Sequence, residues 1–223
     1  MFFNKNTRFF LLIFGLATVI MAIQKPTVTT AYQEEYTNPI PRFTDLTFVI
    51  SGTSNVRDWD INADVLNGVI QPGPLFATLA GSEGFENMPD GEGAWFEEVT
   101  LSIPADHLDS GIAVMNQTMH KHLRSEEYPE LGYRLVDVES VSRDAETGKI
   151  QIKAKGIASA AGEEHELVHE VWIDYSTPPL IRVSGEMDVT FSDFRIEPPT
   201  FMRGALTTGN AMKISFGFAY IPE

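Results

Sequence analysis

The residues with the clearest chemical signature are His165, Glu166 and His169, which form the pattern H-E-x-x-H. On a helix this spacing places two histidine ligands for zinc one turn apart, with a glutamate beside them as a general base. The helix is essential, because residues four apart are separated by about 5–6 Å on a helix but by about 13 Å along a strand. The local sequence favours a strand, since β-branched and aromatic residues follow the motif until Pro178-Pro179. We therefore expect the two histidines to share one strand face without sharing a metal ion.

Other titratable residues form no recognisable catalytic group. The adjacent glutamates at 97–98, 126–127 and 163–164 are typical of solvated edges or turns, and not of an acid/base pair. No motif supports a Ser-His-Asp triad, and no glycine-rich phosphate loop leads from a strand into a helix. We expect a protein that is not an enzyme, with no catalytic residue, no metal and no cofactor apart from a bound ligand. A zinc hydrolase built on the H-E-x-x-H motif is kept as a less favoured alternative.

Alternation of hydrophobic and polar residues indicates the elements that would position these side chains. It is clearest near the C-terminus, where Met212, Ile214, Phe216, Phe218 and Tyr220 would share one inward face. Turn signals such as Asn67-Gly68, Pro72-Gly73 and Thr147-Gly148 separate the segments. The other strands that we expect are Leu46–Ser51, Arg57–Val65, Leu75–Ala80, Val99–Ile103, Leu131–Val141, Ile150–Ala158, Glu164–Tyr175 and Val183–Phe191. The fold class is therefore all-β: a single extended antiparallel barrel of about eight strands, closed because closure removes exposed edges.

One segment departs from the strand pattern. Residues 109–125 carry Ile112, Met115, Met119 and Leu123 at helical spacing, and Asp109 or Ser110 is available as an N-cap. We expect one short amphipathic helix, packed over an end or a flank of the barrel.

The N-terminal segment has the plan of a secretory signal peptide. Lys5 and Arg8 precede an uncharged apolar run of 15 residues, 9–23, which is shorter than the roughly 20 residues that span a bilayer. Cleavage after Ala31 is expected, and cleavage after Ala22 is the competing choice. The domains are then 1–31 signal peptide, 32–42 irregular lead-in and 43–223 barrel domain. Without a cysteine the chain has no lipoprotein anchor, so we expect a periplasmic or secreted protein with no membrane span in its mature form.

The net negative charge of the chain argues against some classes of binding partner. Residues 1–31 hold three of the 16 cationic side chains and none of the 31 acidic ones, so their removal changes the formal charge from −15 to −18. An acidic surface is repelled by phosphate backbones and anionic headgroups, which argues against nucleic acid as a partner and against polybasic membrane docking. A simpler explanation of the acidic surface is that it keeps the protein soluble or adapts it to a high salt concentration.

Four pieces of the sequence resemble the YceI family in their order and spacing. They are Phe48–Trp59 with its Ser-x-Val-x-Asp-Trp ending, Leu108–Tyr133, Gly148–Gly162, and Asp193–Pro199 followed by Arg203-Gly204, Gly209 and the last strand. Together they span residues 43–221. One departure is Thr53-Ser54, where many relatives carry a His-Ser pair. The resemblance implies a lipocalin-like barrel that encloses a long lipid, such as an isoprenoid quinone or a polyprenyl chain.

A lipid carrier of this kind binds through the inward face of the barrel. Flat and flexible apolar side chains suit a long apolar guest, although ordinary core packing is the more common role for each of them taken alone. The expected ligand-binding residues are Phe48, Ile50, Trp59, Leu101, Met115, Met119, Tyr133, Leu135, Met187, Phe191, Phe194, Ile214, Phe216 and Phe218. The alternative is an envelope interaction or stress module with a filled barrel, and the sequence leaves a homodimer open.

Overall fold

The computed structural model describes residues 43–76, 94–177 and 179–221. The expected signal peptide 1–31 and lead-in 32–42 lie outside this range. Within it, no helix has both the length and the apolar character needed to cross a membrane.

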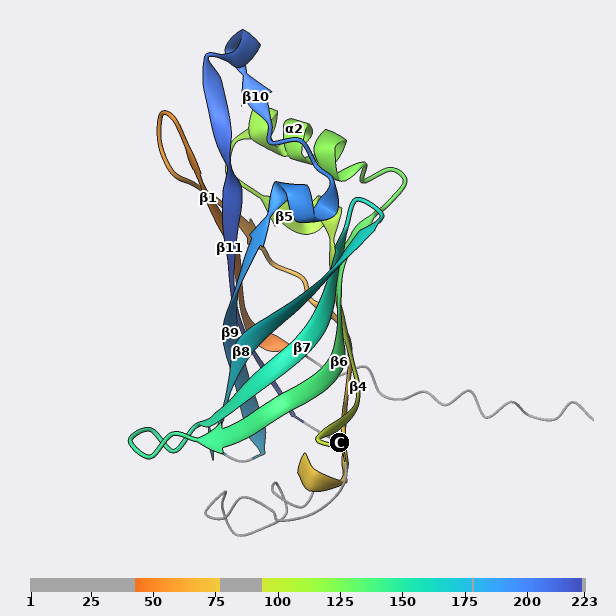
Figure 1. Cartoon of the computed structure of the whole chain (residues 1–223), viewed down its shortest axis with the longest axis vertical. Coiled ribbons are helices and arrows are strands. Elements are labelled where there is room, and N and C mark those ends of the chain that lie inside the picture. The colour runs from red at the N-terminus through yellow and green to blue at the C-terminus, as the bar shows by residue number, and fades with distance from the viewer. Residues whose placement is uncertain (1–42, 77–93, 178, 222–223) are drawn as a thin grey trace, which may run out of the picture. The chain divides into compact units, whose positions relative to one another are not determined.

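The described part of the chain folds into one antiparallel sheet of eleven strands (Figure 1). Along the sheet the order is β3-β4-β6-β7-β8-β9-β11-β1-β2-β5, and β10 pairs separately with β11. The strands are β1 Thr44–Ser54, β2 Trp59–Ala63, β3 Asn67–Pro72, β4 Phe96–Pro104, β5 Leu108–Asp109, β6 Glu130–Arg143, β7 Ile150–Ala160, β8 Glu163–Thr177, β9 Leu180–Thr190, β10 Thr200–Phe201 and β11 Leu206–Tyr220. The helical elements are α2 Ala113–Leu123 and the short 3₁₀ helices η1 Ala105–His107, η2 Phe191–Phe194 and η3 Met202–Gly204.

The sheet curls so that one face of each long strand points to a shared interior, which confirms the antiparallel, lipocalin-like all-β class. Strand β7 is an example: its buried and less buried residues alternate along its whole length, as expected for a strand with one face in a core. Strand β11 lies between β1 and β9 and pairs with both. Among the described residues no ladder joins β3 to β5, so the hydrogen-bonded path stays open there.

The helix forms where the apolar spacing predicted one, but it begins later. Its N-cap is Ile112, and neither Asp109 nor Ser110 caps it, which corrects the expectation. Both residues instead stabilise the turn before the helix. Asp109 accepts hydrogen bonds from the Gly111 amide at 2.8 Å and from the Asn116 side chain at 2.6 Å, and the Ser110 hydroxyl donates to the Asn116 side-chain oxygen at 2.6 Å. Helix α2 lies at the same end of the sheet as β5 and β10 (Figure 1).

Two strand predictions were wrong. The expected turn at Asn67-Gly68 is the beginning of β3, where Gly68 has φ 145° and lies so close to the Thr100 carbonyl that a side chain would clash. Of the expected strand Leu75–Ala80, residues 75 and 76 are helical and the remainder lies outside the described range. The described residues form eleven strands, whereas about eight were expected. Short strands such as β5 and β10 were missed because they are too short to show alternation of hydrophobic and polar residues.

The buried residues form two clusters at different levels of the sheet. The helix-side cluster contains Ile103, Leu108, Leu167, Met187 and Phe194, with residues of α2 packed against it. The Tyr220 cluster contains Ile150, Ile173, Ile181, Phe218 and Tyr220.

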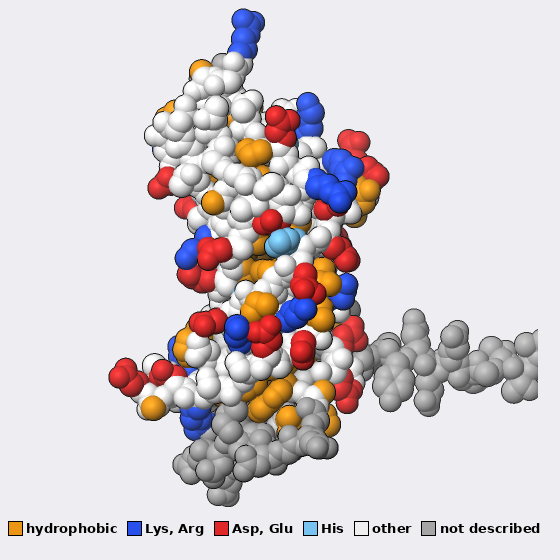
Figure 2. Space-filling view, viewed as in Figure 1, with side chains coloured by type: hydrophobic (Ala, Val, Ile, Leu, Met, Phe, Trp, Pro, Cys, Tyr) orange, Lys and Arg blue, Asp and Glu red, His pale blue; other side chains and the backbone are white. Residues whose placement is uncertain are grey.

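The outer face is polar and carries ion pairs between neighbouring strands. Figure 2 shows acidic and basic side chains interspersed over this face. Lys213 lies 2.9 Å from Glu186 and Lys155 lies 2.9 Å from Glu166. Exposed pairs of this kind contribute only about 0–1 kcal/mol each, so burial on the inner face dominates the stability of the sheet.

Candidate ligand-binding cavity

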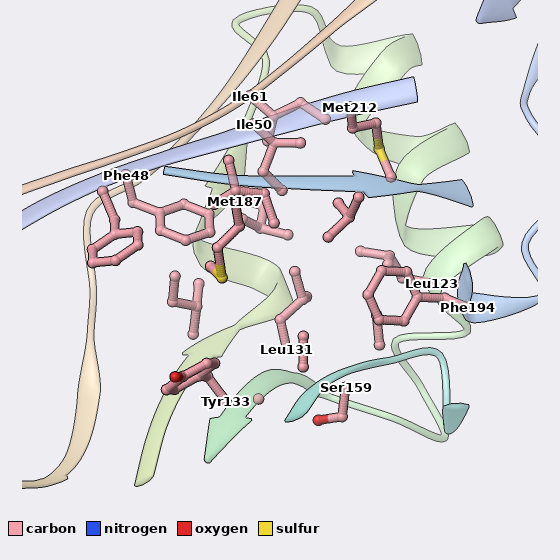
Figure 3. Close-up of a pocket in the computed structure, with 18 of the residues that line it drawn as sticks. Phe48, Ile50, Ile61, Leu123, Leu131, Tyr133, Ser159, Met187, Phe194 and Met212 are labelled. Atoms are coloured by element: carbon pink, nitrogen blue, oxygen red, sulfur yellow. The ribbon is translucent and has the colours of Figure 1, made fainter. Parts of the chain in front are cut away.

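The curled sheet and α2 line a partly open cavity of about 600 Å³, which falls in the usual range of roughly 300–1,000 Å³ for small-molecule sites. Its wall is predominantly apolar and draws on nearly every long strand. Figure 3 shows Phe48, Met187 and Tyr133, from three different strands, pointing into the shared space. The sheet therefore holds an open apolar interior and not a filled core.

All fourteen side chains expected from the sequence to contact a ligand lie on the wall of this cavity. They are Phe48, Ile50, Trp59, Leu101, Met115, Met119, Tyr133, Leu135, Met187, Phe191, Phe194, Ile214, Phe216 and Phe218. Their shared position follows from strand and helix periodicity, which places alternate residues of each strand and the apolar stripe of the helix on one side.

The wall also contains residues that were not among the expected ligand contacts. Alternation along the strands could have indicated the inward apolar positions among them. The group includes Leu46, Ile61, Leu123, Leu131, Ile152, Ala154, Ala158, His169, Ile173, Val183, Met212 and Tyr220. The small residues of β7 that line the cavity gave no signal for a ligand contact.

Charge is nearly absent from the cavity although the chain has 31 acidic residues. Among the described wall residues Arg57 is the only arginine, lysine, aspartate or glutamate, and the histidines of the wall are His122 and His169. Arg57 lies in the turn between β1 and β2, where its amide donates a hydrogen bond to Ser54 at 3.1 Å. The described wall therefore offers neither a carboxylate pair for acid/base chemistry nor an acidic set of metal ligands.

The H-E-x-x-H motif lies on β8, as its sequence context predicts, and its two histidines and its glutamate lie in three different environments. His165 faces η2, where its Nδ1 lies 3.8 Å from a carboxylate oxygen of Asp193. Glu166 points outward and pairs with Lys155. His169 lies on the cavity wall. The strand keeps the two histidines on one face but separates them by about 13 Å, which is too far for one zinc ion.

His169 lies among aromatic rings. It stands at right angles to the ring of Tyr133 at 5.3 Å and near the ring of Phe216 at 6.3 Å. Its side chain is 7% exposed, and its Nδ1 is buried without a hydrogen-bond partner. Burial lowers the pKa of His169 to about 4, because the charged form would lose its hydration. The imidazole is therefore neutral at neutral pH.

The ring of Tyr133 lies over Gly156 of β7. A methyl group at Gly156 would clash with the ring and hydroxyl of Tyr133, so the glycine is needed for the close approach of the ring to the strand. Burial raises the pKa of the Tyr133 phenol above its usual value, and the hydroxyl stays protonated. Gly156 thus lets the Tyr133 ring cross β7 towards His169.

Trp59 and Phe194 are held in place at the helix side of the cavity. The Trp59 ring lies against Gly52, and its indole nitrogen donates a hydrogen bond to the Thr53 carbonyl at 3.1 Å. Phe194 ends η2, which begins with a capping box in which Thr190 and Asp193 exchange hydrogen bonds of 3.2 and 2.7 Å. These local bonds fix the direction of two large apolar side chains on the wall.

Comparison with known proteins identifies the fold. No family model matches the chain, and no curated protein sequence matches it. Solved structures do match. A polyisoprenoid binding domain from Saccharophagus degradans implicated in plant cell wall breakdown aligns with a TM-score of 0.59 and 12% identity, over 82% of this chain and 98% of that domain.

Two further structures agree with this match. Burkholderia cenocepacia BcnA aligns with a TM-score of 0.51 and 12% identity, over 77% of this chain and 95% of BcnA. A Campylobacter jejuni YceI protein aligns with a TM-score of 0.52 and 14% identity, over 73% of this chain and 85% of that protein. At such identities the likeness concerns the fold. The chain has a YceI-like fold, as the resemblance in its sequence predicts.

Proposed function

We propose that this chain is an exported, non-enzymatic carrier that holds one long-chain isoprenoid or similar amphiphilic lipid in its cavity. The observation that carries the proposal is the wall itself: a predominantly apolar cavity of about 600 Å³ in which Arg57 is the only arginine, lysine, aspartate or glutamate among the described residues. Each methylene group buried there would contribute about 0.8 kcal/mol, so a long chain needs few polar contacts. The Saccharophagus degradans structure of the same fold is a polyisoprenoid binding domain, which supports the same ligand class here.

The cavity distinguishes this proposal from its main alternative. An interaction module with a filled barrel would pack its inward side chains against one another and leave no space of this size. The large inward side chains here instead face a shared cavity. Export rests on the pattern of residues 1–31, and we propose the periplasm or the medium beyond it as the location.

Native mass spectrometry of protein purified from its own cell envelope tests the carrier function. We expect a lipid adduct near one per chain, and solvent extraction should recover a long apolar molecule. A protein that is empty in repeated preparations and takes up no isoprenoid from vesicles would contradict the proposal.

A matched pair of variants shows whether such a lipid lies in the cavity. Ala158→Phe adds a ring to the inner face, where Ala158 is 8% exposed and lines the cavity. Val168→Phe adds the same ring to the outer face, where Val168 is 46% exposed. We expect the first variant to lose most of the adduct and the second to keep it. Equal retention by both would place the lipid elsewhere.

A further inference from the structure

His169 is a polar side chain buried in the wall of an apolar cavity, and its position bears on which lipid the cavity takes. Its Nδ1 has no hydrogen-bond partner, and no described residue forms a hydrogen bond with the ring. A buried polar atom that lacks a partner costs about 1–3 kcal/mol, and native structures contain few of them. An occupant of the cavity that hydrogen-bonds to the imidazole would remove this cost.

Tyr133 provides a second polar group at the same place. Its ring lies 5.3 Å from that of His169 at an interplanar angle of 90°, and both residues line the cavity. No described residue forms a hydrogen bond with the Tyr133 hydroxyl. A phenol and a neutral imidazole together provide two donors and at least one acceptor. We call these two side chains the His169–Tyr133 pair.

The pair lies in the middle of the cavity, between the two hydrophobic clusters. Along β8, Leu167 belongs to the helix-side cluster, and Val171 packs against the Tyr220 cluster. His169 lies between them and faces Phe216, which contacts both clusters. A polar group of the ligand that reached this pair would therefore lie inside the cavity, with apolar wall on both sides along the strand.

The surroundings favour an uncharged ligand group. Burial keeps the imidazole neutral and the phenol protonated, since it lowers the pKa of His169 and raises that of Tyr133. The one charged residue of the described wall, Arg57, belongs to the turn between β1 and β2 and not to the level of the pair. A carboxylate or phosphate beside the pair would lose its hydration and find no cation there, which is costly in an apolar interior.

We propose that the His169–Tyr133 pair receives an uncharged oxygen of the lipid, a hydroxyl or a carbonyl, so that the ligand binds with this group enclosed in the barrel. This inference rests on the proposed carrier function and specifies its substrate class. The preferred lipid is a neutral alcohol, phenol or carbonyl compound with a long apolar chain. Charged lipids and plain hydrocarbons of equal length bind less well.

Competition between matched lipids tests the inference on the full chain. Geranylgeraniol, the hydrocarbon that lacks its hydroxyl group, and the corresponding carboxylic acid are presented in pairs, and bound ratios are measured by native mass spectrometry. We expect the ratio of alcohol to hydrocarbon affinity to fall about tenfold from wild type to His169→Phe, because one buried hydrogen bond is lost. Tyr133→Phe, which removes only the hydroxyl, should lower the same ratio.

The other histidine of the motif provides the matched control. His165→Phe changes the same residue type on the same face of β8, outside the cavity wall, and should leave the ratio unchanged. Equal ratios in wild type and His169→Phe would overturn the inference and leave the carrier function standing. Binding of the acid at neutral pH as tightly as the alcohol would overturn the inference in the same way. Binding of none of the three lipids would overturn both.

Discussion

The two hydrophobic clusters of the barrel differ in composition, above all in their methionines. In the Tyr220 cluster Ile150, Ile181 and Tyr220 are at most 2% exposed, and the described members include no methionine. The helix-side cluster contains Met187 and packs against Met115, Met119 and Met212, while α2 itself contributes no buried residue.

This difference assigns the two ends of the cavity different physical properties. Branched and aromatic side chains with few rotamers make a closely packed, well-defined wall, whereas methionine is flexible and adapts to irregular shapes. We infer that the Tyr220 cluster forms the more rigid end of the barrel interior. The helix-side cluster is then the part that can adjust to different chains of a bound lipid.

Truncation in the two clusters gives the largest expected contrast. Phe218 is 5% exposed and packs edge-to-face on Phe43 at 5.2 Å, so Phe218→Ala should lower the free energy of unfolding by about 3–5 kcal/mol. Met115→Ala on α2 should cost clearly less, because Met115 is only partly buried beside the cavity. Urea unfolding measures both values. If Met115→Ala were as costly as Phe218→Ala, the division of roles between the clusters would be wrong.

His169, which lies at the boundary between the clusters, should make the free energy of unfolding of the protein depend on pH. His169 has a pKa of about 4 in the folded protein and about 6.5 when unfolded. The unfolded chain therefore binds the proton first as the pH falls, and stability is lost between pH 6.5 and 4. The loss attributable to His169 should reach about 2 kcal/mol at pH 5 and about 3 kcal/mol at pH 4.

The measurement compares unfolding free energies of wild type and His169→Phe across this range. The variant lacks the titrating group, so the difference between the two proteins isolates His169 from the many carboxylates. His165→Phe serves as the control because His165 is more exposed and lies near Asp193. If the difference in unfolding free energy between wild type and His169→Phe stayed constant with pH, His169 would be hydrated or paired in solution. The two clusters would then not be separated by a dry, buried histidine.

Local periodicity predicts much of the fold and the cavity wall. Alternation along β11 placed Met212, Ile214, Phe216, Phe218 and Tyr220 on one inner face, and they do line the cavity. Strand β3 was missed because Asn67-Gly68 and Pro72-Gly73 are turn signals that enclose only a short apolar stretch. Its pairing with β4 decides its conformation, and pairing is a tertiary effect that local propensity does not contain.

The properties of the candidate site that depend on several strands could not be predicted from the sequence. His169 is on the expected face of β8, but its lack of a partner depends on what β6 and β11 place around it. The approach of Tyr133 depends in turn on the absence of a side chain at Gly156. Such arrangements follow from the register between strands, which a one-dimensional pattern specifies only weakly.

The smallest expected effect concerns the methionines of the helix-side cluster. Met115→Leu and Met187→Leu together preserve volume and hydrophobicity, so stability should change by less than about 1.5 kcal/mol per site. Leucine has fewer side-chain conformations than methionine, so the double variant should discriminate more strongly between straight and methyl-branched lipids of equal length. Competition binding with such a lipid pair measures this ratio, and Ile173→Leu in the Tyr220 cluster is the control. An unchanged ratio would mean that both clusters are equally adaptable, because the flexibility of methionine would then contribute nothing to the fit of the chain.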